Sequence, residues 1–165
     1  MNEFDISQAE PSADELSVLL DTSFGPGRLA RTAERLREAN QPVRAYGFCA
    51  RNSDGKLLGT ISYWPIRIGE AAGLLLGPLA VHPDLQGRGV GQDLMRASLG
   101  VIDKSRFAFT LLVGDLPYYE RVGFTIAPAE VSLPGPVDPA RLLVLGDAAI
   151  CAALSGMVRP APELC

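Results

Sequence analysis

The chain has 165 residues, 47% of them hydrophobic, and this length suits one domain with a single substantial core. No apolar run approaches the roughly 18 residues of a membrane span, and Met1–Asp5 lacks the basic-then-apolar pattern of a secretion signal. We therefore expect a single domain over residues 1–165 that is cytoplasmic and makes no contact with a membrane.

Charge and cysteine usage exclude further classes of protein. The net charge is −4 at pH 7, and the basic residues are scattered, so a nucleic-acid partner is not expected. Cys49, Cys151 and Cys165 show no paired spacing, which argues against a disulfide framework and against a metal site. Cys49 lies in an apolar stretch typical of a core, whereas Cys165 is expected to be exposed.

A short strand and a helix are predicted at the start of the chain. Phe4–Ser7 forms the strand, and Ser12 and Glu15 have the spacing of a capping box that begins a helix. Phe24–Gly27 ends this helix because proline and glycine interrupt its pattern. The charged stretch Arg28–Glu38 then predicts a second, largely exposed helix.

The middle of the chain predicts a hairpin and a buried strand. Ala45–Arg51 and Lys56–Ile68 are rich in aromatic and β-branched residues, and residues 52–55 between them form a strong turn signal. Gly73–Val81 is a nearly continuous apolar run, which indicates a strand in the middle of the sheet. Pro78 has no N–H for a sheet ladder, so pairing is expected to lapse or bulge there.

A helix and a second buried strand follow. Gln86–Gly91 predicts a tight turn into a helix whose exposed side carries Gln92, Asp93 and Arg96. Phe107–Val113 is again nearly continuous in apolar residues. Strand, helix and strand in this order predict a right-handed parallel crossover.

The tail begins with a short helix that ends at Gly123, a residue suited to a left-handed cap. Its predicted elements are the helix Leu116–Val122, a strand from Phe124–Ala127, a loop over Pro128–Pro139, a final strand over Leu142–Leu145 and a helical turn over Asp147–Leu154.

The turn before the first long helix carries the clearest functional signal. Gly87, Gly89 and Gly91 let successive N–H groups converge on one point, to which the helix adds its positive end. Arg88 supplies a charge that is expected to matter more for affinity than for chemistry. The turn lacks the Gly-Lys-Ser/Thr of nucleotide-triphosphate loops and the spacing of the dinucleotide fingerprint. It predicts a phosphate or pyrophosphate site, with tight packing alone as the alternative.

Two motifs in the expected order resemble the GNAT superfamily of acetyl-CoA-dependent N-acetyltransferases, in particular its small, bacterial-type, single-domain members. Gln86-Gly87-Arg88-Gly89-Val90-Gly91 matches the family's pyrophosphate motif, which is Gln or Arg, two residues, Gly, one residue, and Gly or Ala. Leu79-Ala80-Val81-His82-Pro83 resembles the end of the family's fourth strand, and Tyr118–Phe124 resembles its second motif. The resemblance is strongest from about Gly77 to Phe124.

The resemblance implies a mixed α/β (α+β) fold, with a central, mostly antiparallel sheet, a parallel and splayed pair of fourth and fifth strands, and flanking helices. The splayed pair would admit the pantetheine arm of acetyl-CoA, the implied cosubstrate, and no metal is implied. The expected cofactor-binding residues are Leu79, Ala80, Val81, Gln86, Gly87, Arg88, Gly89, Val90, Gly91 and Gln92.

Amine acetylation needs an oxyanion donor and a proton for the departing thiolate. A backbone N–H near Leu79 or Ala80 is the candidate donor. Tyr119 matches the family's tyrosine that hydrogen-bonds the coenzyme sulfur, so the resemblance makes it the candidate catalytic acid. The alternative is a core aromatic whose hydroxyl is satisfied by the backbone.

No general base is predicted, because Leu74–Val81 contains no acidic residue and Glu70 is only a weak candidate. His82, the one histidine, is expected to be a loop residue that is solvated or bonded to backbone. Asp115 departs from the family pattern, in which many members carry an asparagine before the tyrosine.

Candidate acceptor-lining residues are Phe24, Tyr63, Trp64 and Arg67, each of which is equally compatible with ordinary packing. An Arg67 that faced the pocket would favour a substrate with a carboxylate, although strand alternation could turn it to solvent.

The leading hypothesis is an N-acetyltransferase that moves an acetyl group from acetyl-CoA to a primary amine of a small molecule or protein, by direct attack in a ternary complex. The first alternative is a non-catalytic acyl-CoA sensor, favoured by the missing base and disfavoured by Tyr119. The second is an interaction module whose glycine turn only packs. Exposed edge strands would allow a homodimer.

Overall fold

The computed structural model describes residues 3–165, so the sequence-based expectation about Met1 and Asn2 lies outside the described residues. The chain forms two compact units, which are described separately. The first unit comprises Met1–Ala30, Val43–Tyr63 and Gly77–Ile102. The second unit comprises Arg31–Pro42, Trp64–Leu76 and Asp103–Cys165.

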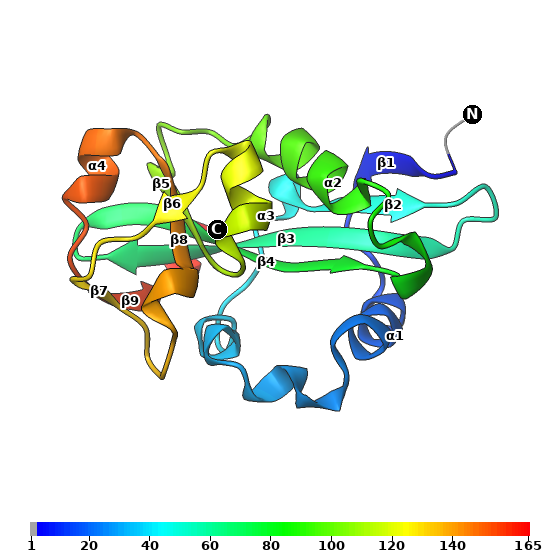
Figure 1. The fold of residues 1–165 in the computed structure, drawn as a ribbon, viewed down its shortest axis with the longest axis horizontal. Coiled ribbons are helices and arrows are strands. Elements are labelled where there is room, and N and C mark those ends of the chain that lie inside the picture. Colours follow the sequence, from blue (N-terminus) through cyan, green and yellow to red (C-terminus); the bar gives the residue numbers. More distant parts are fainter. Residues whose placement is uncertain (1–2) are drawn as a thin grey trace. The chain divides into compact units, whose positions relative to one another are not determined.

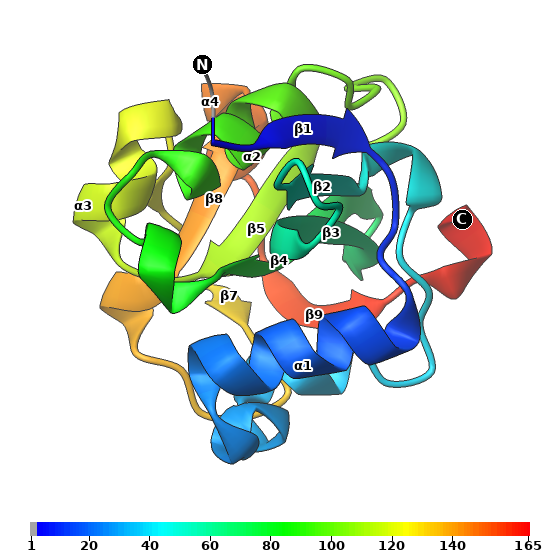
Figure 2. The same ribbon diagram turned by 90° about the vertical axis from the view of Figure 1, so that its right-hand side faces the viewer.

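The first unit is a set of strands with one helix on each face. Its strands follow the order β1-β2-β3-β4, and α1 and α2 cover opposite faces of them (Figure 2). β3 and β4 are long strands that continue into the second unit (Figure 1). The elements are β1 (Asp5–Gln8), α1 (Ala13–Phe24), β2 (Phe48–Arg51), β3 (Leu57–Ile68), β4 (Ala71–Val81) and α2 (Val90–Leu99).

The capping box predicted for α1 is present in full. The Glu15 N–H donates to the Ser12 hydroxyl (3.2 Å), and the Ser12 N–H donates to the Glu15 carboxylate (3.0 Å). Arg51 of β2 adds a two-pronged ion pair to the same carboxylate, at 2.7 and 3.0 Å. These hydrogen bonds lower the pKa of Glu15 from 4.5 to about 2, and the bond from Arg51 makes the largest contribution.

We expect Ser12→Ala to lower the free energy of unfolding by about 1 kcal/mol, because it removes the acceptor for an orphan N–H of α1.

The lowered pKa of Glu15 adds stability above about pH 4.5 that is lost as the pH falls towards 2. Urea unfolding of wild type and Glu15→Gln from pH 7 to pH 2.5 measures this, and their difference should shrink on acidification. Ser17→Ala, at an exposed position inside α1, is the control for Ser12→Ala and should not lower the free energy of unfolding. A difference that is constant with pH would contradict the linkage.

The second unit contains the parallel strand pair. Its strands follow the order β3-β4-β5-β8-β6, and β9 pairs with both β3 and β7. β4 and β5 are parallel over residues 73–75 and 109–111, whereas β5 and β8 are antiparallel. The remaining elements are β5 (Phe109–Val113), α3 (Leu116–Tyr119), β6 (Thr125–Ile126), β7 (Val131–Ser132), β8 (Leu142–Gly146), α4 (Ala148–Ala152) and β9 (Gly156–Pro160).

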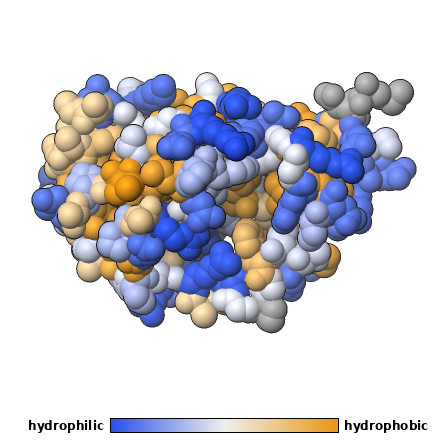
Figure 3. Space-filling model, in the orientation of Figure 1, coloured by the Kyte–Doolittle hydropathy of each residue, from blue (hydrophilic) through white to orange (hydrophobic). Residues whose placement is uncertain are grey.

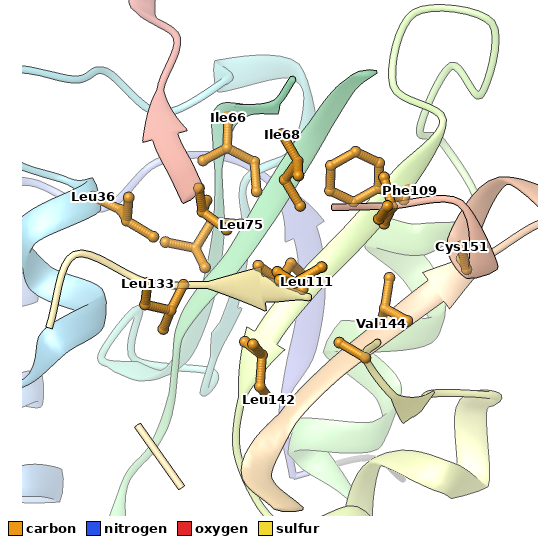
Figure 4. Close-up of a cluster of buried hydrophobic side chains, with 14 residues drawn as sticks. Leu36, Ile66, Ile68, Leu75, Phe109, Leu111, Leu133, Leu142, Val144 and Cys151 are labelled. Carbon is orange, nitrogen blue, oxygen red and sulfur yellow. The ribbon is translucent and has the colours of Figure 1, made fainter. Parts of the chain in front are cut away.

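Each unit has its own apolar cluster. In the first unit, Leu19 and Leu20 of α1 pack on Cys49, Leu57 and Ala80. In the second unit, side chains from β3, β4, β5 and β8 converge on one another (Figure 4). The largest fully buried members of that cluster are Leu36, Ile66, Leu75, Phe109 and Leu111.

The structure corrects four predictions about elements. Arg28–Glu38 is not an α-helix but lies in two 3-10 turns, Pro26–Ala30 and Thr32–Leu36. Its polar groups bond to a distant loop, where Thr32 donates to the Pro136 carbonyl (2.5 Å). Ala45 lies in a further 3-10 turn, so the first strand of the hairpin begins later than predicted. The predicted loop Pro128–Pro139 contains β7, and β9 follows the strand that was expected to be last.

The predicted fold class is confirmed. The chain is a mixed α/β protein with a mixed sheet, a parallel β4–β5 pair and flanking helices. Within residues 3–165, no helix has both the length and the apolar character required to cross a membrane.

Candidate active site

The glycine-rich turn of the first unit has two of its three glycines in the left-handed region. Gly87 and Gly89 have φ values of +81° and +82°, in the left-handed region that favours glycine. A Cβ at either position would meet nothing within 4 Å, so backbone conformation and not crowding requires glycine there. Gly89 is the N-cap of α2, whose first N–H groups have no acceptor within the helix. The first turn of α2 thus places backbone N–H groups without intrahelical partners at the positive end of the helix, whereas the Arg88 N–H already donates to the Leu85 carbonyl (3.2 Å).

The end of β4 leads into this turn through a short 3-10 turn, Pro83–Leu85. The Ser23 hydroxyl of α1 donates to the Val81 carbonyl (3.2 Å), and the His82 N–H donates to the Leu58 carbonyl (2.7 Å). Ala80 is 1% exposed and packs in the core, whereas Leu79 and Val81 are partly exposed. Ala80 can thus serve a ligand only through its backbone.

One side chain near the turn differs from its predicted environment, and another has a partner that was not predicted. Gln92 was predicted on the exposed side of the helix, but it is buried, because α2 buries a wider face that includes Met95 and Ser98. Arg88 is about half exposed and forms an ion pair with Glu3, which precedes β1. The sequence does not predict this pair, since 85 residues separate its members.

Tyr119 lies in the second unit, at the end of α3, and is held on several sides. Its ring makes edge contacts with Tyr118 (centroids 4.9 Å apart) and with Phe124 (5.9 Å). Its N–H donates to the Asp115 carbonyl (3.2 Å), and its carbonyl accepts from the Phe124 N–H (3.3 Å). The turn ends at Gly123 with φ +103°, as predicted for a left-handed cap.

Burial raises the pKa of Tyr119 from 10.0 to about 12, and the nearby Tyr118 and Asp115 add to the shift. Arg141, which forms an ion pair with Asp115 (3.3 Å), acts in the opposite direction. The phenol is therefore protonated across the physiological range, as a proton donor must be.

The candidate acceptor-lining residues are largely packing residues. Tyr63 is fully buried and its hydroxyl bonds to the Ser98 hydroxyl of α2 (2.7 Å), so it cannot line a pocket. Phe24 and Trp64 pack against the apolar clusters of the first and second unit, respectively. Arg67 pairs with the Glu163 carboxylate and donates to the Glu70 carbonyl, both at 3.3 Å.

The other singled-out side chains have local roles. His82 caps the 3-10 turn, with its Nδ1 accepting from the Asp84 N–H (3.2 Å), which agrees with the predicted backbone-bonded loop histidine. Glu70 is exposed in the turn between β3 and β4. Cys49 and Cys151 are buried and Cys165 is exposed. Among residues 3–165, no three His, Cys, Asp or Glu side chains gather as metal ligands would.

A pocket of about 280 Å³ lies in the second unit. None of the site residues predicted from the sequence is among those that line it. The lining residues come from β6, β8, α4 and the adjoining turns, and they are Gly123, Thr125, Ile126, Pro128, Val144, Gly146, Ala148, Cys151 and Ala152.

Comparison with known proteins identifies the family. Residues 44–126, half of the chain, match the family described as acetyltransferase (GNAT) domain. This span contains both the glycine-rich turn and Tyr119. The chain therefore belongs to the GNAT family of acetyltransferases.

Individual relatives agree with this assignment. The chain is 27% identical over 117 residues to the uncharacterized N-acetyltransferase YhbS of Escherichia coli K12, covering 70% of this chain and 69% of that protein. The structure of Escherichia coli YhbS in complex with CoA has a TM-score of 0.77 at 22% identity, over 96% of this chain and 90% of that chain. A Brucella melitensis GNAT acetyltransferase in complex with acetyl-CoA has a TM-score of 0.60 at 26% identity, over 88% and 97%.

Proposed function

We propose that this protein is an N-acetyltransferase that moves an acetyl group from acetyl-CoA to a primary amine of a small molecule or protein. The observation that carries the proposal is the left-handed glycine turn at the start of α2, together with a protonated, partly buried Tyr119. CoA and acetyl-CoA in two similar structures support the choice of cosubstrate.

In the proposed reaction, the neutral amine attacks the thioester carbonyl carbon directly in a ternary complex, and a C–N bond forms. A backbone N–H near Leu79 or Ala80 stabilises the developing oxyanion. The C–S bond then breaks, and Tyr119 protonates the departing thiolate. The nitrogen loses its proton to solvent, and solvent returns a proton to the phenolate of Tyr119. Solvent takes the place of a general base here because β4 carries no acidic side chain.

The proposal treats residues 1–165 as one acetyltransferase domain of the cytoplasm. The turn of the first unit (Gln86, Gly87, Arg88, Gly89, Val90, Gly91, with Gln92) would hold the pyrophosphate, and Leu79, Ala80 and Val81 would contact the pantetheine arm through backbone. Tyr119 of the second unit would supply the proton.

The test is thiol release from acetyl-CoA by the wild-type protein with a panel of primary amines, including amino acids, polyamines and peptides with a free N-terminus. Isothermal titration with acetyl-CoA and CoA accompanies it. Amine-dependent thiol release establishes the transferase. Acetyl-CoA binding without turnover on any amine would favour the acyl-CoA sensor, for which the missing acidic residue on β4 is the supporting observation. No binding at all would contradict both functions.

Arg88 provides a prediction of moderate size. Arg88→Gln should weaken acetyl-CoA binding about tenfold, because it removes one charge-assisted contact to phosphate. Isothermal titration at two salt concentrations measures this, and the loss should shrink at high salt. Glu3→Gln is the matched control, since it breaks the same ion pair but removes the carboxylate that competes for Arg88. Glu3→Gln should bind at least as tightly as wild type, and weakened binding there would assign the Arg88 effect to the lost pair.

A homodimer is also part of the proposal. β6 lies at the end of the strand order of the second unit, and Ile126 on it is 51% exposed. Figure 3 shows hydrophobic residues on the face that carries β6. The outer edge of β6 would offer its backbone groups to a second copy, and the exposed Ile126 would be covered there.

A further inference from the structure

Gly114, the residue that follows β5, lies directly against the ring of Tyr119. A Cβ built on Gly114 would overlap the ring at Cε2 and lie 3.0 Å from Cδ2, well inside the usual separation of about 3.5–4.0 Å between carbon atoms. It would also lie 3.1 Å from Cδ1 of Leu112. The backbone of Gly114 is outside the left-handed region, so space alone requires glycine here.

The backbone of Gly114 is itself fixed. Its N–H donates to the Arg141 carbonyl (2.9 Å), which joins it to the residue just before β8. One residue later, the Asp115 carbonyl accepts from the N–H groups of Tyr118 (3.1 Å) and Tyr119 (3.2 Å). Residues 114–119 thus form a hydrogen-bonded turn in which the backbone of Gly114 lies directly against the ring of Tyr119.

Two neighbouring rings also contact the ring of Tyr119. Tyr118 and Phe124 meet it at interplanar angles of 83° and 72°. A ring held between two edge contacts and a bare backbone has little freedom to tilt or shift. The close approach of Gly114 therefore limits, together with these two rings, where the Tyr119 hydroxyl can lie.

We propose that Gly114 is a positioning residue for Tyr119: the absence of a side chain at 114 fixes the depth and tilt of the phenol ring and so places its hydroxyl for protonation of the thiolate. This inference rests on the proposed function for its catalytic part. The packing part, that a side chain at 114 displaces the Tyr119 ring, stands on the geometry alone.

The packing part is tested by stability without any assay of activity. Gly114→Ala should lower the midpoint of urea unfolding in the wild-type background. In the Tyr119→Ala background, where the ring is absent, the same substitution should cost little. If Gly114→Ala lowers the midpoint equally in both backgrounds, the proposal is overturned. If the single variant does not fold, Gly114→Ala/Tyr119→Ala should fold, and its failure to do so would also overturn the proposal.

The catalytic part is tested with a double-mutant cycle on the rate. Gly114→Ala should lower kcat about tenfold to a hundredfold, since a displacement of about 1 Å costs that much, with a much smaller change in KM for acetyl-CoA. In the Tyr119→Phe background the same substitution should reduce kcat little further, because the phenol proton is already gone. Equal losses in the two backgrounds would show that Gly114 does not act through Tyr119.

Gly73 offers a matched control in the same unit. A Cβ there would lie 2.5 Å from Cε2 of Phe109, a core ring with no proposed chemistry. Gly73→Ala should therefore lose stability as Gly114→Ala does, while the folded protein keeps its kcat. A fall in kcat with Gly73→Ala equal to that with Gly114→Ala would reduce the effect to general destabilisation and contradict the positioning role. If Tyr119→Phe keeps full kcat, Tyr119 is not the catalytic acid and the catalytic part of the proposal is contradicted. The unfolding measurements in the two backgrounds still test whether Gly114 positions the Tyr119 ring.

Discussion

Gly89→Glu should lower the affinity for acetyl-CoA by about 10²-fold or more. Two effects combine in this substitution. A side chain at φ +82° costs about 1–2 kcal/mol of backbone strain, and the new carboxylate stands at the helix end where the pyrophosphate is proposed to bind. Isothermal titration with acetyl-CoA and with CoA measures the change, which should be similar for the two ligands because they share the pyrophosphate.

Gly55→Glu is the matched control for this loss. Gly55 lies in the turn between β2 and β3 with the same φ of +82°, and a Cβ there also meets nothing within 4 Å. The control thus carries the same strain and charge on a different turn. Gly89→Asn separates the two effects at the site, since asparagine tolerates the left-handed region without a charge. Equal losses with Gly55→Glu and Gly89→Glu would count against the phosphate turn.

Tyr119→Phe should lower kcat about 10²-fold while KM for acetyl-CoA changes little, because the substitution keeps the ring and removes only the acidic proton. Thiol release under saturating acetyl-CoA and amine measures kcat. Tyr118→Phe is the matched control, since this neighbouring tyrosine is in edge contact with Tyr119 and has no assigned proton transfer. A normal kcat in Tyr119→Phe, or an equal fall in Tyr118→Phe, would remove Tyr119 from the chemistry.

The raised pKa of Tyr119 gives this prediction a pH dependence. Because its pKa is about 12, the phenol should remain a competent acid up to about pH 10, and kcat should show no alkaline decline from its ionisation below that. Linkage has the matching sign: the shift adds stability below pH 10 that is lost as the pH rises through 12. An alkaline limb below pH 10 that disappears in Tyr119→Phe would show that the phenol ionises more easily than its burial implies.

Local signals predicted the elements around the site because their causes are local. The capping box at Ser12 and Glu15 begins α1, and left-handed glycines close the turn at Gly89 and the short helix before Gly123. In each case a residue type suited to one backbone geometry appears within four residues of the structure it forms. The same property made the glycine-rich turn, Gln86–Gly91, and the segment Tyr118–Phe124 recognisable as motifs.

Elements that depend on distant partners were not predictable in this way. Residues 32–36 form a 3-10 turn where a helix was predicted, and Thr32 and Arg35 donate to carbonyls of the loop at Pro136 and Pro134 about 100 residues later. β9 is a short strand that exists through its pairing with β3 and β7. Neither partner is visible in the composition of the segment itself.

The features of the candidate site also fall into those that local sequence predicts and those that depend on distant partners. By itself the sequence determined the left-handed glycines at 89 and 123 and the two motifs, Gln86–Gly91 and Tyr118–Phe124, because each depends on residue types at fixed spacing. The resemblance that these motifs carry indicated the family and, through it, the fold class. Only the tertiary structure decided that Gln92 is buried, that Arg88 pairs with Glu3 and that Gly114 lies under Tyr119. Burial, ion pairing and close approach depend on which surfaces meet after folding, and no local pattern of residues carries that information.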